Sequence, residues 1–227
     1  MRIERREVAQ SVVAMLLVVA GPAWAAGEIR EPETNVAFPA ERRFGPHRMR
    51  CVGTAVREKF GFDVYAACLY VDAAKGKAKL LEYLKSKEPG AYAGGKVNVS
   101  QLQGSEQFFR WLIASDLAIA VDMTFVREVA MEKIKAQWVE GLAHYLQDAA
   151  LRDKFVGPLS GDVKKYEHLT LTFFPGGKVQ LQQAGRTYPA IVSQPLARAL
   201  LSIWLGHKPV TAKIKRDLVK LVDTLAQ

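Results

Sequence analysis

The sequence predicts an α+β fold in which helices cover one face of a long antiparallel sheet. Segments with alternating apolar and polar residues, typical of strands, are mixed with segments whose apolar residues recur at helical spacing. Several strand pairs are separated only by short turns, which makes the paired strands antiparallel. The regular strand–helix–strand succession that a parallel sheet requires is missing, so an antiparallel sheet with segregated helices is expected.

The first 25 residues are predicted to be a cleaved signal peptide. Arg2, Arg5 and Arg6 precede an apolar run of about 11 residues, SVVAMLLVVAG, and Ala23-Trp24-Ala25 forms an A-x-A cleavage pattern. The run is shorter than the roughly 20 residues that span a bilayer, and no cysteine follows it for a lipid anchor. We therefore expect a mature protein that starts near Ala26 and is periplasmic or secreted.

The mature chain is expected to form one domain, over residues 48–227, after an extended lead-in over 26–47 that is rich in Pro, Glu and Gly. The alternation of apolar residues is clearest in LAIAVDMTFV. Two turn sequences, Glu58-Lys59-Phe60-Gly61 and Pro175-Gly176-Gly177, each join two strands. The predicted strands are 48–57, 62–71, 96–102, 117–126, 168–174 and 178–183.

Helices are predicted where apolar residues fall on one helical face. The long helix places Ile134, Trp138 and Leu142 on such a face, and Thr211 can cap the last helix. The tryptophans at 138 and 204 lie on apolar stripes and are core candidates. The predicted helices are one over 74–87, a short one that carries Phe108, Phe109, Leu112 and Ile113, one over 128–150, one from Leu196 that ends at Gly206, and a final one, capped by Thr211, that buries Ile214, Leu218, Leu221 and Leu225.

The charge of the chain favours anionic partners. The net charge of +9 becomes about +8 once the three arginines and two glutamates of the signal peptide are removed. The basic residues are scattered, as in a solvated surface, and export would separate the protein from nucleic acid, so we expect no nucleic-acid partner. Peripheral contact with an anionic membrane surface is compatible with this charge. The sequence leaves the oligomeric state open.

Standard cofactor and metal motifs are missing from the sequence. The histidines His47, His144, His168 and His207 are far apart, and neither HExxH nor CxxC occurs. GxGxxG, P-loop and GxSxG patterns are also missing. We therefore expect no metal site and no cofactor.

Three motifs resemble the chalcone isomerase-like proteins. They are GTAVREKFGFDVYAACLYV at 53–71, LTFFPGGKVQL, and the helix–turn–helix LLSIWLGHKPVTAKIKRDL. The resemblance extends over roughly 48–222 and implies an open-faced β-sandwich: a long antiparallel sheet, a helical layer on one face, and a ligand cleft between them. It also implies one of two activities, flavanone ring closure or noncatalytic binding of fatty acids through an arginine and a tyrosine.

The residues at the family's site positions favour binding over catalysis. Arg57 matches the family arginine, and Tyr65 stands where a catalytic member has threonine. The helix tyrosine of catalytic members falls near Ala130, and their asparagine falls near Gln137. Loss of these groups removes acid–base assistance that is commonly worth about 10²–10⁴ in rate, so no catalytic residue is assigned.

A carboxylate ligand suits the remaining groups. A buried guanidinium is costly unless it is paired, and a carboxylate can accept two of its hydrogen bonds. The hydroxyl of Tyr65 can donate to the same carboxylate, and Thr124 and Ser202 are further candidates for the cleft wall. Arg127 could also reach the cleft but is more often a solvated residue at such a position, and Tyr70 is expected to be structural.

In a regularly paired first hairpin, a disulfide between Cys51 and Cys68 excludes a pair of Arg57 and Tyr65 on one face of the sheet. A register that places Cys51 opposite Cys68 places Arg57 and Tyr65 on opposite faces of the sheet. Without a bulge the hairpin can therefore hold the disulfide or the Arg57–Tyr65 pair, but not both. Export favours the bridge, whereas the resemblance favours the pair. We give the resemblance more weight and expect the Arg57–Tyr65 pair, which predicts two unbridged, largely buried thiols.

The sequence thus predicts an exported, noncatalytic protein of the chalcone isomerase fold that binds a small amphipathic acid such as a fatty acid. Two alternatives stay open. One is an isomerase or lyase that uses Arg57 as an electrostatic stabiliser. The other is an envelope interaction module whose cleft is filled by Trp138, Trp204 and phenylalanine side chains.

Overall fold

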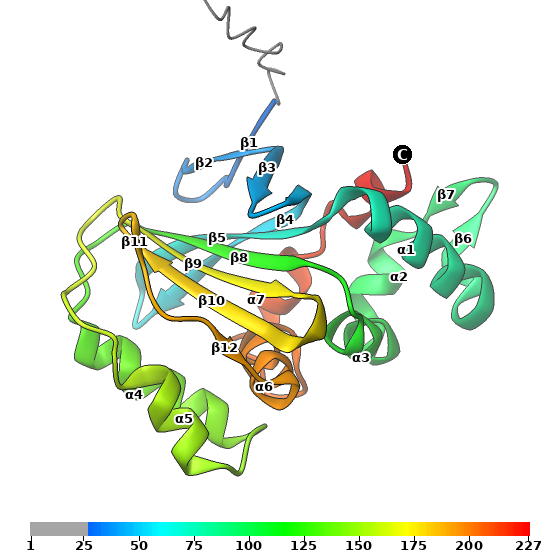
Figure 1. Cartoon of the computed structure of the whole chain (residues 1–227). Helices are drawn as coiled ribbons and strands as arrows, with labels where there is room; N and C mark the ends of the chain where they lie inside the picture. Colours follow the sequence, from blue (N-terminus) through cyan, green and yellow to red (C-terminus); the bar gives the residue numbers. More distant parts are fainter. Residues whose placement is uncertain (1–26) are drawn as a thin grey trace, which may run out of the picture.

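A curled eight-stranded antiparallel sheet organises the chain (Figure 1). The computed structural model describes residues 27–227, so the predicted signal peptide lies outside the described residues. The strands follow the spatial order β11-β10-β9-β8-β5-β4-β3, and β12 pairs with β10. Their bounds are β3 Glu41–Phe44, β4 His47–Lys59, β5 Phe62–Asp72, β8 Ile119–Phe125, β9 His168–Phe174, β10 Lys178–Gln183, β11 Arg186–Thr187 and β12 Ile191–Val192.

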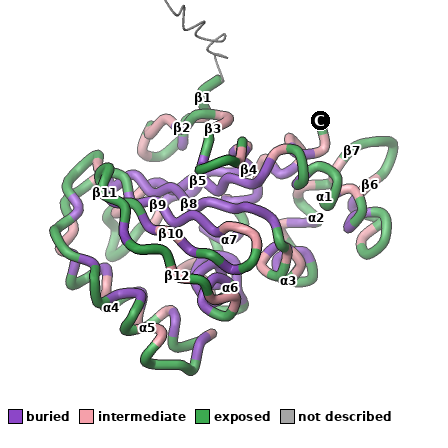
Figure 2. Tube along the Cα trace, viewed as in Figure 1, coloured by how far each residue is buried: buried purple, intermediate pink, exposed green. Residues whose placement is uncertain are grey.

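The helices form the main core with one face of this sheet. Alternate residues of β5, such as Ala67 and Leu69, point toward the helices, and the central strands are buried along their length (Figure 2). Leu200 and Trp204 pack into the same core from α6. The helices are α1 Ala73–Lys87, α2 Val99–Gly104, α3 Glu106–Ala114, α4 Met131–Ala143, α5 Ala149–Val156, α6 Gln194–Leu205 and α7 Ala212–Asp217, with 3-10 turns at Pro89–Ala91, Pro175–Gly177 and Val222–Ala226.

The opposite face of the sheet carries a smaller core beneath the N-terminal segment. The two-stranded sheet of β1 (Glu28–Arg30) and β2 (Ala37–Pro39) lies across this face, on the side away from α4 and α6 (Figure 1). Phe38 and Phe44 pack there against Cys68 and Tyr70 of β5. The predicted lead-in is thus part of the fold, and its β3 forms the edge strand beside β4.

Three predicted elements differ in the structure. The strand over 96–102 is wrong beyond β7 (Lys96–Val97), because the Asn98 side chain accepts from the Gln101 main-chain N–H and starts α2. The β7 segment pairs with β6 (Tyr92–Ala93) in a two-stranded sheet separate from the main one. The long helix over 128–150 is two helices, because Asp148 caps a new one, α5.

The last predicted helix is also shorter, and the reason lies in β4. Helix α7 ends at Asp217, and the chain then turns so that the N–H of Leu221 donates to the carbonyl of Val52 at 2.8 Å. Val52 is the residue skipped by the pairing of β4 with β5, so its carbonyl would otherwise lack a partner in the ladder. Gly53 follows, and a Cβ at this position would overlap main-chain atoms of Asp217 and Leu218. The glycine therefore permits the close approach of α7 to β4.

The bulge at Val52 also explains how the two cysteines can form a disulfide. The register shifts between Cys51 and Gly53, so Arg57 pairs with Tyr65 while Cys51 pairs with Tyr70. Cys51 and Cys68 are buried and joined by a disulfide, on the face away from the helices. The prediction of unbridged thiols is therefore wrong, because the extra residue lets one hairpin hold both features.

Candidate functional site

A cavity of about 890 Å³ lies between one end of the sheet and the helices α4 and α6. Its wall includes Arg57, Tyr65 and Phe125 from the sheet. Its buried apolar lining is contributed by three elements of the main core: Met123, Phe125 and Leu169 from the sheet, Ile134 and Trp138 from α4, and Ile203 and Trp204 from α6. The two tryptophans are core residues, as predicted, but they border the cavity without filling it.

Arg57 lines this cavity and is only partly satisfied by the protein. Its Nη1 donates to the main-chain carbonyl of Glu58 at 2.6 Å, next to the second register shift of the hairpin. A guanidinium has five N–H groups. Within residues 27–227, no carboxylate pairs with Arg57, so its other donors are available to a ligand.

Tyr65 lies directly across the hairpin from Arg57 and on the same face of the sheet. Its hydroxyl oxygen accepts from the indole Nε1–H of Trp204 at 3.1 Å. Burial raises the pKa of Tyr65 above its usual value of 10.0, although the Trp204 hydrogen bond and the charge of Arg57 act in the opposite direction. The phenol is therefore protonated at neutral pH, and its proton can be donated to a group bound beside Arg57.

Basic residues predominate around the cavity. Glu128, one of the two acidic residues of the wall, is already bonded to Lys164. This balance favours an anionic group in a site whose lining is otherwise apolar. The charged residues of the wall are Arg57, Lys59, Arg127, Lys133 and Lys208, against Glu128 and Glu140.

The two positions at which catalytic relatives were expected to carry tyrosine and asparagine also border the cavity. Ala130 precedes α4, and Gln137 lies on its exposed side. Ala130 has no proton to exchange, and the Gln137 amide donates to Glu140 at 3.2 Å. The hydroxyl expected of a catalyst is thus missing from this part of the wall.

Two of the predicted wall residues do not line the cavity. Thr124 is on the opposite face of the sheet, where its hydroxyl lies 3.4 Å from His168 Nδ1. Ser202 is buried in α6 and donates to the carbonyl of Arg198 at 2.7 Å. Arg127, a weaker candidate from the sequence, is exposed and also lines the cavity, while Tyr70 belongs to the other core.

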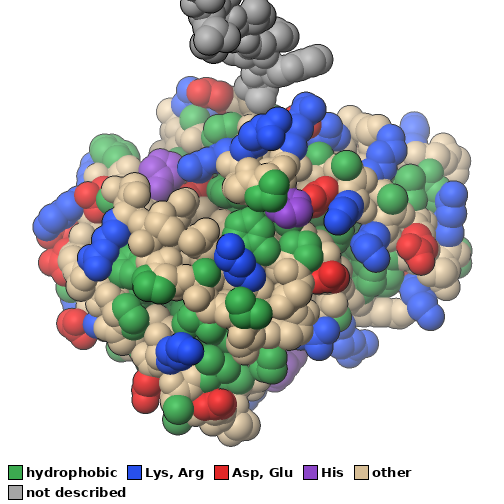
Figure 3. Space-filling view, in the orientation of Figure 1, with side chains coloured by type: hydrophobic (Ala, Val, Ile, Leu, Met, Phe, Trp, Pro, Cys, Tyr) green, Lys and Arg blue, Asp and Glu red, His purple; other side chains and the backbone are tan. Residues whose placement is uncertain are grey.

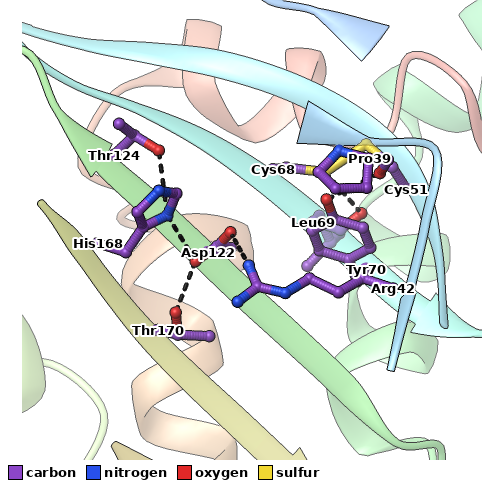
Figure 4. A network of polar contacts seen from close by, with 10 residues as sticks. All are labelled: Pro39, Arg42, Cys51, Cys68, Leu69, Tyr70, Asp122, Thr124, His168 and Thr170. Atoms are coloured by element: carbon purple, nitrogen blue, oxygen red, sulfur yellow. Dashed lines mark hydrogen bonds and ion pairs between the residues drawn. A yellow bond between two sulfur atoms is a disulfide. The ribbon is translucent and has the colours of Figure 1, made fainter. Parts of the chain in front are cut away.

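A second polar cluster occupies the opposite face and is fully paired (Figure 4). Asp122 of β8 is completely buried; its Oδ2 accepts from Arg42 at 2.7 Å and its Oδ1 accepts from Thr170 at 2.6 Å. Burial would raise the pKa of Asp122, but the contacts with His168, Arg42 and Thr170 outweigh this and lower it. Tyr70 donates to the carbonyl of Pro39 at 2.9 Å. These contacts bind the N-terminal segment to the sheet, and they leave no open acceptor for a ligand.

Sequence reasoning found Arg57 and Tyr65 but missed Trp204 as the partner of the tyrosine. The helical spacing of Trp204 marks it only as apolar, and its indole N–H meets Tyr65 through a contact between residues 139 positions apart. Nothing local in the sequence signals such a contact. In the described part of the chain, no group of three His, Cys, Asp or Glu side chains could hold a metal ion.

Comparison with known proteins places the chain in a family. Residues 106–219, half of the chain, match the family described as chalcone isomerase-like. The chain belongs to the chalcone isomerase-like family, as its motifs predicted.

Relatives with this fold include plant proteins. Fatty-acid-binding protein 1 of Arabidopsis thaliana is 22% identical over 210 residues, covering 86% of this chain and 71% of the relative. The crystal structure of an Arabidopsis thaliana fatty-acid-binding protein superposes with a TM-score of 0.70 at 20% identity, covering 88% of this chain and 99% of the other. The latter similarity shows that the predicted α+β sandwich is the correct fold.

Proposed function

We propose that the protein binds an unesterified fatty acid, with the carboxylate at Arg57 and the acyl chain in the cavity. One observation carries the proposal: the Arg57 guanidinium, which has no carboxylate partner among residues 27–227, and the protonated phenol of Tyr65 meet at the wall of an apolar cavity of about 890 Å³. The carboxylate would accept charge-assisted hydrogen bonds from Arg57 and one more from Tyr65. The relatives described as fatty-acid-binding proteins support this choice of ligand.

The acyl chain provides a graded test of the cavity. Each buried methylene contributes about 0.8 kcal/mol, so each added methylene should tighten binding about fourfold until the cavity is filled. Saturated fatty acids of increasing length, titrated in competition with a fluorescent fatty acid, would reveal this dependence. Affinities that do not change with chain length would contradict the proposed position of the acyl chain.

Replacement of Arg57 is the direct test of the head-group site. Arg57→Ala should weaken binding ten- to a hundredfold, because hydrogen bonds to charged groups are worth about 1.5–3 kcal/mol. Arg43→Ala is the matched control, since Arg43 is an exposed arginine on β3, outside the cavity wall. The proposal fails if wild-type protein binds no fatty acid, or if the Arg57 and Arg43 variants bind it equally well.

A noncatalytic role follows from the same wall. Ala130 and Gln137 stand where ring-closing relatives were expected to supply a tyrosine and an asparagine, so we expect no acceleration of chalcone cyclisation. The measurement is the loss of chalcone absorbance with and without protein. Turnover abolished by Arg57→Ala would instead establish the isomerase alternative.

We also infer that the protein is exported. The basic start, the apolar run and the A-x-A pattern support a signal peptide. The buried disulfide between Cys51 and Cys68 suits an oxidising compartment. Fractionation of the source cells, followed by N-terminal sequencing, should find a mature chain beginning near Ala26; a cytosolic chain that retains Met1 would contradict export.

A further inference from the structure

Two exposed aromatic residues occupy turn positions that disfavour them. Phe60 has φ +54° and is 89% exposed, and Tyr166 has φ +67° and is 65% exposed. A side chain with a Cβ is strained in this left-handed region, where glycine and asparagine are preferred. Neither backbone geometry nor burial in the core therefore explains why these positions carry aromatic rings.

Both residues lie at the end of the sheet where the cavity opens. Phe60 is in the turn between β4 and β5, and β5 is connected to the end of β8 by the hydrogen bond from Val126 N–H to the Val64 carbonyl at 3.1 Å. Tyr166 N–H in turn donates to the carbonyl of Phe125 in β8 at 2.6 Å. Phe60 and Phe62 are exposed and also line the cavity, so they mark its mouth.

Each of these rings has a basic neighbour. Lys59 Nζ lies 5.5 Å from the Phe60 ring centre, and Lys165 Nζ lies 4.8 Å from that of Tyr166. Arg127 lies 4.9 Å from the Phe62 ring centre. Across residues 27–227, none of these three cations has an ion-pair partner. On the face seen in Figure 3, basic and acidic side chains are interspersed.

We propose that this end of the sheet, defined by Lys59, Phe60, Phe62, Arg127 and Lys165–Tyr166, docks on an anionic lipid bilayer. Aromatic rings with a polar or basic neighbour are favoured at the headgroup level, and each lysine or arginine there gains from anionic lipid. Aromatic residues and arginine are also common at protein–protein interfaces, but lysine is depleted there, so Lys59 and Lys165 favour a lipid surface over a protein partner.

The docked orientation turns the mouth of the cavity toward the membrane. A fatty acid could then pass between bilayer and cavity without crossing water, a consequence that rests on the proposed function. The docking itself requires only the surface. Among residues 27–227, no helix combines the length and the hydropathy needed to span a bilayer.

Vesicle flotation tests the docking surface. Wild-type protein should float with vesicles of equal parts phosphatidylcholine and phosphatidylglycerol, and much less with phosphatidylcholine alone or at high salt. The double variant Phe60→Asn/Tyr166→Asn should lower the partition coefficient at least tenfold without lowering the melting temperature, since asparagine suits both backbone conformations. Val192→Ser is the control, because Val192 is an exposed apolar residue (73% exposed) outside the docking surface. It pairs with Lys178, the first residue of β10.

Two double variants of lysine residues test the contribution of charge to vesicle binding. Lys59→Gln/Lys165→Gln should reduce binding to the anionic vesicles severalfold, whereas Lys85→Gln/Lys87→Gln, in the exposed last turn of α1, should not. Equal flotation of all variants and wild type would overturn the proposal, as would a failure of the wild type to float.

A third measurement separates this proposal from the proposed function. Tyr166 and Lys165 do not line the cavity, so Tyr166→Asn/Lys165→Gln should bind fatty acid normally in vesicle-free solution while floating poorly. Arg57→Ala should do the reverse. Vesicle binding by a protein without fatty-acid affinity would refute only the proposed function, and fatty-acid affinity without vesicle binding would refute only the docking.

Discussion

The two faces of the sheet each carry an arginine, but only one of the two, Arg42, is paired with a carboxylate among residues 27–227. On the face under the N-terminal segment, Arg42 meets the buried carboxylate of Asp122 at 2.7 Å, and that carboxylate also accepts from Thr170. On the face under the helices, Arg57 borders a cavity, and its one protein acceptor among residues 27–227 is a main-chain carbonyl. Arg42, which holds the N-terminal segment to the sheet, thus has a carboxylate partner from the protein itself. Arg57 has no such partner within residues 27–227, so its guanidinium can receive a carboxylate from a ligand.

The largest effect is expected from removing the disulfide on the paired face. The bridge closes a loop with a sequence separation of 17, which corresponds to about 3 kcal/mol of unfolding free energy. Cys51→Ala/Cys68→Ala should lose this amount in urea unfolding and keep its fatty-acid affinity, because the bridge faces away from the cavity. Wild-type protein reduced with dithiothreitol is the control and should lose the same unfolding free energy. A tenfold loss of fatty-acid affinity in the variant would show that the two faces are coupled.

Removal of the carboxylate that pairs with Arg42 should have the next largest effect. Asp122→Asn should lower the free energy of unfolding by about 2 kcal/mol at pH 7, since it leaves the guanidinium without its charged acceptor. Asp153→Asn, at an exposed position in α5, should change it by less than about 0.5 kcal/mol.

The same variant predicts a pH dependence. The pKa of Asp122 is lowered in the folded protein, so its contribution is complete above the usual aspartate pKa of about 3.9 and is lost as the pH falls through the lower folded value. The difference in unfolding free energy between wild type and Asp122→Asn should therefore be present at about pH 5 and shrink in stronger acid, as Asp122 itself becomes protonated. A difference that does not shrink below the usual aspartate pKa would contradict the assigned ion pair.

The smallest effect is expected from a change of Tyr65 at the cavity wall. Tyr65→Phe removes the phenolic donor but leaves Arg57, so fatty-acid affinity should fall about fivefold, corresponding to about 1 kcal/mol. Emission from Trp138 and Trp204, which border the cavity, provides the readout. In a double-mutant cycle, the effect of Tyr65→Phe should be smaller in the Arg57→Ala background if both groups hold one carboxylate. Fully additive effects would place the two groups on different ligand atoms.

The site was predictable where its signal was local and unpredictable where it depended on neighbours distant in sequence. Arg57 and Tyr65 lie in one hairpin and could be assigned from its motif. Thr124 could not be excluded from the cavity by sequence, because its face depends on the pairing of β8 with β5, which places it beside Ala66 on the other side. Ser202 was misplaced for a similar reason, since the orientation of α6 against the sheet fixes which helical face is open.

By itself, the sequence determined the fold class, the main strands, the amphipathic helices and the pairing of an arginine with a tyrosine in the first hairpin. These follow from side-chain periodicity and turn residues within short segments. The tertiary structure decided the bulge at Val52, where the approach of α7 supplies a hydrogen bond from Leu221 to a carbonyl that the ladder leaves unpaired. Because of this extra residue, the cysteines face one side of the sheet and Arg57 faces the other. The contact between Leu221 and Val52 joins residues more than 160 positions apart, so the periodicity of the sequence cannot reveal it.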